Sequence, residues 1–221
     1  MLVSEALQKR KSVRAFLPKP VEKHTIERIL QAAGHAPSGV NSQPWQVAVV
    51  TGETRQKLQE KTEAAFRSGA DKSMGYHYYP LTWIEPYKGR RKATGLQMYS
   101  TLGIGREDKQ RQIDQWAANY RAFDAPVMLL FFLDPVMEKG SFIDYGIFLQ
   151  SIMLAAVEEG LATCPQAALG EFPEIVLQTL GYPEDWLVIG GMALGYEDTD
   201  ALVNSYRTPR EEIASFTRFF E

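Results

Sequence analysis

Four basic residues lie close to a small hydroxyl in the segment QKRKSVRAF, residues 8–16. In an extended chain successive side chains alternate between two faces, so Arg10, Ser12 and Arg14 would point to one side, with Lys11 beside them. Two guanidinium groups and a hydroxyl suit a terminal phosphate, because guanidinium groups bind phosphate through paired hydrogen bonds. The alternative is a solvated basic face on a first helix. The segment therefore indicates either a small anion site or an ordinary charged surface.

A second segment, APSGVNSQPW at residues 36–45, combines small residues with amides between an expected helix and an expected strand. Small residues let another backbone or a flat ligand come close, and amide groups can satisfy the donors and acceptors of a heterocycle. By itself, the segment fits a plain helix–strand loop better than a binding loop.

Other familiar site patterns are absent. The glycines of GIGRED (103–108) do not follow a strand, and GGMALG (190–195) ends a strand without a clear helix after it, so neither fits a dinucleotide fingerprint. The three histidines have no partners at metal-ligand spacing, and no metal is expected. No Gly-x-Ser-x-Gly elbow occurs, and Cys164 lacks a local histidine, so hydrolytic or thiol nucleophiles are not indicated.

The composition describes an ordinary globular protein. The chain has 221 residues, 45% of them hydrophobic, and a formal net charge of −3. This charge offers no general attraction for nucleic acid. One cysteine excludes an internal disulfide, the first twenty residues lack a signal-peptide core, and the apolar runs look too short or too polar to span a bilayer. We therefore expect a cytoplasmic protein without membrane or nucleic-acid partners.

Apolar patterning predicts an α+β domain. We expect buried strands at 45–51 and 125–134, a third strand with a glycine-loosened end at 185–196, and helices capped by Thr25 and beginning near Thr54 and near 107. The segment 145–160 is apolar on nearly all sides, which indicates a central helix in a core or a subunit interface. Residues 68–124 have the character of an insert or lid on a single domain, 1–221, and their first part is rich in glycine, proline and aromatic residues.

Four segments in order carry a family resemblance: RKSVRAF, APSGVNSQPW, GLATCPQAA and NSYRTPREE. Together they resemble the FMN-dependent nitroreductase family, and the insert is similar to that of a bacterial branch acting on nitroaromatics such as nitrobenzoates. The resemblance implies a three-layer α+β fold with a mixed, mainly antiparallel sheet. It also implies an intertwined homodimer with FMN in clefts between the subunits.

The resemblance also assigns cofactor contacts. The phosphate would bind the N-terminal cluster and Arg207, and Ser205 stands where relatives often carry a further basic residue. The loop at 37–41 would reach the flavin of the other subunit, and the segment 164–168 would pass beside the isoalloxazine ring. The complete implied set is Arg10, Lys11, Ser12, Arg14, Pro37, Ser38, Gly39, Asn41, Gln150, Cys164, Pro165, Gln166, Ala167, Ala168 and Arg207.

The implied activity is ping-pong reduction of nitroaromatic or quinone acceptors by NAD(P)H through FMN, with no catalytic side chain. Some aromatic residues of the insert could roof the pocket for a flat aromatic substrate, although most of them fit a core or a dimer interface better: Tyr76, Tyr78, Tyr79, Trp83, Tyr87, Trp116, Tyr120 and Phe123. A flavin-dependent dehalogenase, an ene-reductase or a non-catalytic flavin carrier remains the alternative.

Overall fold

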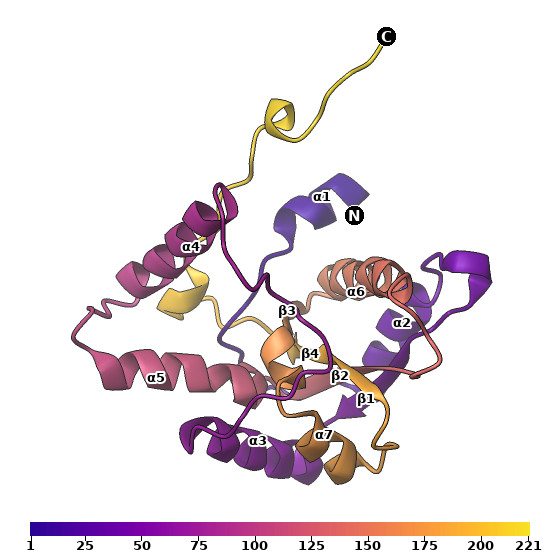
Figure 1. The fold of residues 1–221 in the computed structure, drawn as a ribbon, viewed down its shortest axis with the longest axis horizontal. Helices are drawn as coiled ribbons and strands as arrows, with labels where there is room; N and C mark the ends of the chain where they lie inside the picture. Colours follow the sequence, from indigo (N-terminus) through magenta and orange to yellow (C-terminus); the bar gives the residue numbers. More distant parts are fainter.

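The computed structural model describes residues 1–221 as a four-stranded sheet covered by helices on both faces (Figure 1). The strands are β1 (Gln46–Val50), β2 (Val127–Leu133), β3 (Ala162–Gln166) and β4 (Leu187–Gly195), in the spatial order β1-β2-β4-β3. All three strand pairs are antiparallel, and the one parallel pairing is an isolated bridge between Ser12 and Thr163. The predicted α+β class, with a mainly antiparallel sheet, is confirmed.

Seven α-helices surround this sheet. They are α1 (Val3–Lys9), α2 (Lys23–Ala33), α3 (Gly52–Arg67), α4 (Tyr87–Thr101), α5 (Lys109–Ala117), α6 (Ser141–Glu158) and α7 (Pro173–Leu180). Helix α2 begins at Lys23 with Glu22 as its N-cap, so the expected cap at Thr25 is wrong by three residues, and its buried face is the predicted one. Three short 3-10 helices concern the site: η1 (Gly39–Asn41), η2 (Ala118–Asp124) and η3 (Ala167–Gly170).

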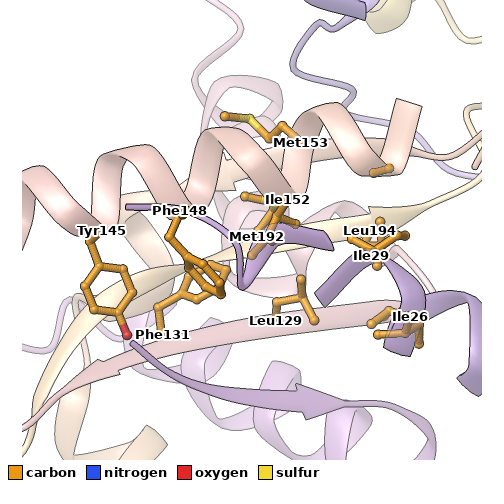
Figure 2. Packing of buried hydrophobic residues seen from close by; sticks show 14 of the residues in the cluster. Ile26, Ile29, Leu129, Phe131, Tyr145, Phe148, Ile152, Met153, Met192 and Leu194 are labelled. Carbon is orange, nitrogen blue, oxygen red and sulfur yellow. The ribbon is translucent and has the colours of Figure 1, made fainter. Parts of the chain in front are cut away.

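The two faces of β2 organise the core. Every residue of this strand is buried, and its side chains alternate between two hydrophobic clusters. Leu129 and Phe131 face the cluster under α2 and α6, which Figure 2 shows, whereas Leu130 and Phe132 face the cluster under α3 and α7. Tyr145 on α6 ties its layer to the sheet, because its hydroxyl accepts a hydrogen bond from the Gln46 N–H at 2.8 Å.

Strands β1 and β3 differ from what the sequence predicts. Strand β1 lies at one edge, and only Val50 is fully buried, so the prediction of a buried strand there is wrong. Strand β3 was not predicted, because Pro165 argues against a strand. Proline is tolerated at a sheet edge, where its missing N–H breaks no ladder, and β3 pairs only with β4.

The segment between α3 and α4 runs across the β3–β4 end of the sheet towards α4 (Figure 1). It is attached by two hydrogen bonds, from the Ser73 N–H to the Glu171 carbonyl at 3.1 Å and from the Tyr76 hydroxyl to the Ile189 carbonyl at 2.6 Å. Helix α4, which was not predicted, lies beside the C-terminal segment, where Gln97 Nε2 donates to the Arg207 carbonyl at 3.2 Å. The insert is therefore part of the folded body.

Helix α6 is the one helix that is long and apolar enough to cross a membrane. The central helices of folded cores meet the same criterion of length and composition.

Candidate functional site

A basic pocket of about 520 Å³ lies between the two ends of the chain. Its walls contain no acidic residue and four arginines. We call this set the basic pocket: Leu7, Gln8, Arg10, Lys11, Ser12, Arg14, Thr94, Tyr206, Arg207, Thr208 and Arg210. The structure therefore brings the N-terminal cluster and Arg207 together, as the sequence analysis expected.

The N-terminal side of this pocket is an extended segment fixed to the edge of the sheet. Helix α1 ends at Lys9, and the Val13 N–H then donates to the Thr163 carbonyl at 3.0 Å. The Val13 side chain is buried, so the alternation along the chain leaves Arg10, Ser12 and Arg14 on the pocket side.

The C-terminal side is fixed by hydrogen bonds across about two hundred residues. The Arg207 guanidinium donates to the carbonyls of Gln8 and Lys9 at the end of α1. These carbonyls have no partner within the helix, so a cation there satisfies them. The Arg14 N–H donates to Asn204 Oδ1 at 2.8 Å. The positions of both pocket walls thus depend on each other.

The pocket holds positive charge that the fold does not neutralise. Burial and the nearby Arg210 and Arg207 guanidinium groups lower the pKa of Arg10 below its ordinary value. Arg10 makes no ion pair, and Lys11 is the exception among the cluster, with its ammonium 2.6 Å from Glu197 Oε1. Partly buried cations without a carboxylate nearby destabilise the empty protein and favour a bound dianion.

A second, largely apolar pocket of about 760 Å³ begins at the other end of β3. We call it the aromatic pocket, lined by Gly75, Tyr76, His77, Tyr78, Phe131, Lys139, Phe142, Tyr145, Gly146, Leu149, Pro165, Gln166, Ala167, Ile189, Gly190 and Gly191. Three of the predicted ring contacts, at 165–167, form part of its wall. Strand β3 runs from Thr163, beside the basic pocket, to this wall, at about 3.3 Å per residue.

Two buried polar atoms on β3 have no hydrogen-bond partner, Thr163 Oγ1 and Gln166 Oε1. The amide nitrogen of Gln166 is used, because Nε2 donates to the Asn119 carbonyl at 2.8 Å. Buried polar atoms without a hydrogen-bond partner are rare in folded proteins, so these two atoms indicate that a bound ligand or water forms hydrogen bonds with them. Cys164 lies between them and is inert, since burial raises the pKa of its thiol to about 11.

The loop at 37–41 lies outside both pockets within one chain. It is held against the first turn of α6, where the Gly39 N–H donates to Asp144 Oδ1 at 3.2 Å. Val40 and Asn41 have left-handed φ values of 49° and 59°, and the Val40 side chain is completely exposed. Gln150 and Ala168 also lie outside both pocket walls. These predicted contacts are therefore not assembled by a single chain.

Sequence reasoning missed Arg210, although it stands three residues after Arg207 in a motif already singled out. It supplies the second C-terminal cation that Ser205 does not. Among the insert aromatics, Tyr76 and Tyr78 line the aromatic pocket as expected. Tyr120 does not: it is fully buried, and its ring stacks on Phe66 at 4.7 Å.

No group of three or more histidine, cysteine, aspartate or glutamate residues could hold a metal ion.

The sequence of the chain matches known proteins over nearly its whole length. The model of the Nitroreductase family covers residues 7–196. The chain is 36% identical to 4-nitrobenzoate reductase of Pseudomonas putida over 95% of this chain and 92% of that protein. It is 38% identical to chloronitrobenzene nitroreductase of Comamonas testosteroni over 98% of this chain and 96% of that protein.

Among solved structures, the FMN and NADPH-dependent nitroreductase NfnB from Sphigopyxis sp. strain HMH superposes with a TM-score of 0.96. That protein is 39% identical, and the match covers 100% of both chains. The family model covers most of the chain, the relatives match over nearly their full length, and the fold of the solved relative is nearly identical. These findings agree with the order of the four sequence segments, and on these grounds the chain belongs to the nitroreductase family.

Proposed function

We propose that the protein is an FMN-dependent oxidoreductase that uses NAD(P)H to reduce nitroaromatic compounds, with quinones as further acceptors. The basic pocket is the observation that carries this proposal, since four arginines without a carboxylate fit a phosphate monoester. The relatives support the reaction class, because the names of both curated relatives are those of nitroaromatic reductases. The named redox cofactors of the solved relative, FMN and NADPH, support the choice of cofactor and donor.

The residues present fit FMN at both ends. Arg10, Ser12 and Arg14 would hold its phosphate together with Arg207 and Arg210, and Gln166, whose Oε1 has no hydrogen-bond partner, lies in the wall of the aromatic pocket. Ala167, in the wall of the aromatic pocket, begins η3, and the first N–H groups of a helix have no partner within it. Its N–H group would face the ring edge and stabilise negative charge there.

The chemistry supplied by bound FMN is two-electron transfer from NAD(P)H to the acceptor. The chain's own part is to bind, orient and exclude water, and two of the three tyrosine hydroxyls of the aromatic pocket, those of Tyr76 and Tyr145, are already bonded to the backbone. Tyr76 donates to the Ile189 carbonyl, and burial raises the pKa of its hydroxyl to about 12. Tyr145 is hydrogen-bonded to the backbone of β1 and β2. We therefore assign no catalytic side chain and propose that protons come from water.

We propose a homodimer with the flavin sites at its interface, working in the cytoplasm as one domain per chain with the insert at 68–124 as the pocket roof. Several large apolar side chains are exposed at the N-terminus and on α1, on α6 and in the C-terminal segment: Met1, Leu2, Val3, Leu7, Ile143, Ile147, Ile213, Phe216, Phe219 and Phe220. Burial of such a surface favours association. The loop at 37–41 and Gln150 would then act on the partner's flavin.

The decisive experiment is anaerobic titration of the purified protein. We expect a yellow protein whose flavin absorbance bleaches with NADPH or NADH and returns when 4-nitrobenzoate or a nitrobenzene is added. Colour that persists with both donors would contradict the proposal and favour a flavin carrier, whereas a protein that stays colourless when FMN is added would contradict a flavin site of either kind. Reoxidation only by a halogenated aromatic or an enone would instead indicate the dehalogenase or ene-reductase alternative.

A further inference from the structure

The insert carries a row of aromatic rings that begins at the aromatic pocket and ends at an arginine. Tyr76 and Tyr78 belong to the pocket wall, with ring centroids 6.4 Å apart. The row continues through Tyr78 and Tyr79 at 4.8 Å and through Tyr79 and Trp83 at 5.7 Å. The Arg91 guanidinium then lies over the Trp83 ring, 5.0 Å from its centroid.

Arg91 is held in place and yet has no anionic partner. Its stacking on Trp83 fixes the guanidinium, because a cation is attracted to the face of an indole ring. It takes part in no ion pair, whereas its neighbour Arg90 pairs with Glu211 at 2.9 Å. The nearest acidic side chain in sequence, Glu85, accepts a hydrogen bond from the Gly89 N–H at 3.0 Å.

Further positive charge surrounds Arg91. Lys88 and Lys92 are exposed on the same first turns of α4, and neither makes an ion pair. The rings of Tyr78 and Tyr79 are exposed as well. The exposed rings offer flat surfaces on which a nucleotide base can stack, and the Arg91 guanidinium offers paired N–H donors to a phosphate monoester.

We propose that Arg91, with Lys88 and Lys92, binds the 2′-phosphate of NADPH, and that the adenine stacks on the exposed ring of Tyr79, which Trp83 supports from behind. This inference rests on the proposed function, since it assigns a site to part of the electron donor. The row of rings leads from the site of the proposed flavin ring to Arg91, so it follows the direction that an extended dinucleotide must take. The site makes the protein prefer NADPH to NADH, because only NADPH carries the 2′-phosphate.

The basic pocket does not offer this second phosphate site. It lies at the opposite end of β3 from the aromatic pocket, and its arginines would be occupied by the FMN phosphate. The two clusters consist of different residues, although α4 contributes to both, because Thr94, one turn after Arg91, lines the basic pocket. They would thus serve two different phosphates.

The first test measures kcat/KM for NADPH and NADH in the FMN-loaded wild type and in Arg91→Ala. We expect the NADPH value to fall about 10- to 100-fold, as for loss of a charge-assisted pair, while the NADH value stays within twofold. Arg91→Lys should recover part of the loss. The matched control is Arg106→Ala, an exposed arginine without an ion pair just beyond the other end of α4, which should change neither value.

The second test needs no turnover: calorimetric titration of the FMN-loaded protein with adenosine 2′,5′-bisphosphate and with adenosine 5′-monophosphate. The wild type should bind the bisphosphate more tightly, and Arg91→Ala should bind both equally weakly. Trp83→Ala should weaken both ligands while leaving the FMN content unchanged.

Two results would overturn the inference: equal affinity of the wild type for both nucleotides, or an NADPH/NADH ratio that Arg91→Ala leaves unchanged. A wild type that binds the bisphosphate tightly but is reduced by neither donor would refute the proposed function instead.

Discussion

Replacement of Arg10 by alanine separates the stability of the empty protein from its affinity for FMN. Arg10 is partly buried, has no carboxylate partner and is repelled by Arg207 and Arg210, as the lowered pKa of its side chain indicates. Its charge therefore does not stabilise the empty fold. With a phosphate bound, the same guanidinium gains a charge-assisted hydrogen bond that contributes about 1.5–3 kcal/mol.

We therefore expect Arg10→Ala to weaken FMN binding about 10- to 150-fold, since about 1.4 kcal/mol corresponds to a factor of ten. The melting temperature of the apoprotein should not fall, because the substitution removes repulsion and no internal partner. Fluorescence quenching of free FMN gives the dissociation constant, and differential scanning calorimetry of the apoprotein gives the stability.

Arg106→Ala serves as the control, since it removes one exposed positive charge outside the wall of the basic pocket and should change neither quantity. An FMN dissociation constant within twofold of wild type would refute the assignment of the phosphate to this pocket. A large fall in apoprotein stability would refute the reasoning about unpaired charge, even if FMN binding were lost.

Three further expectations concern assembly, packing and pH. Ile143→Asp, at a side chain 71% exposed on α6, should convert the proposed dimer into monomers that have lost FMN, as measured by sedimentation with absorbance detection. Gly191→Ala should destabilise the fold by about 1–3 kcal/mol in urea, because a Cβ there would come within 2.7 Å of the Leu129 carbonyl oxygen. The control Gly95→Ala, in open space on α4, should stabilise it by about 0.5–1 kcal/mol. Burial raises the pKa of Cys164 from 9.0 to about 11, so the folded state keeps a proton that the unfolded chain releases, and stability falls as pH rises through this window. That loss, about 3 kcal/mol, should be absent from urea unfolding of Cys164→Ala; equal slopes for both proteins would contradict it.

The elements that the sequence predicts well are those whose side chains all meet one environment. Strand β2 is apolar throughout because both of its faces are buried, so its continuous apolar run is unambiguous. Strand β3 escapes prediction because its burial does not alternate: Thr163, Cys164 and Gln166 are buried, while Pro165, which argues against a strand, is exposed at the sheet edge. In such an edge strand beside a ligand site, polar and apolar residues follow no regular period from which a strand could be predicted.

The candidate site divides in the same way. Alternation alone places Arg10, Ser12 and Arg14 on one face, because that rule acts over five residues. No local rule joins this face to Arg207 or Arg210, which approach through contacts about two hundred residues apart in sequence. The family resemblance supplied Arg207, and only the folded chain revealed Arg210.

Each cationic cluster contains two adjacent basic residues with different roles. One of the two makes an ion pair within the protein, and the other makes none. Lys11 pairs with Glu197 and donates to the Asn204 carbonyl, so it joins the N-terminal segment to the C-terminal half. Arg90 pairs with Glu211 and joins α4 to the C-terminal segment in the same manner. The adjacent Arg10 and Arg91 have no such partner. Because a cation already paired with a carboxylate gains little from a phosphate, whereas an unpaired and immobilised one gains the full charge-assisted bond, ligand binding should depend on the unpaired member of each cluster.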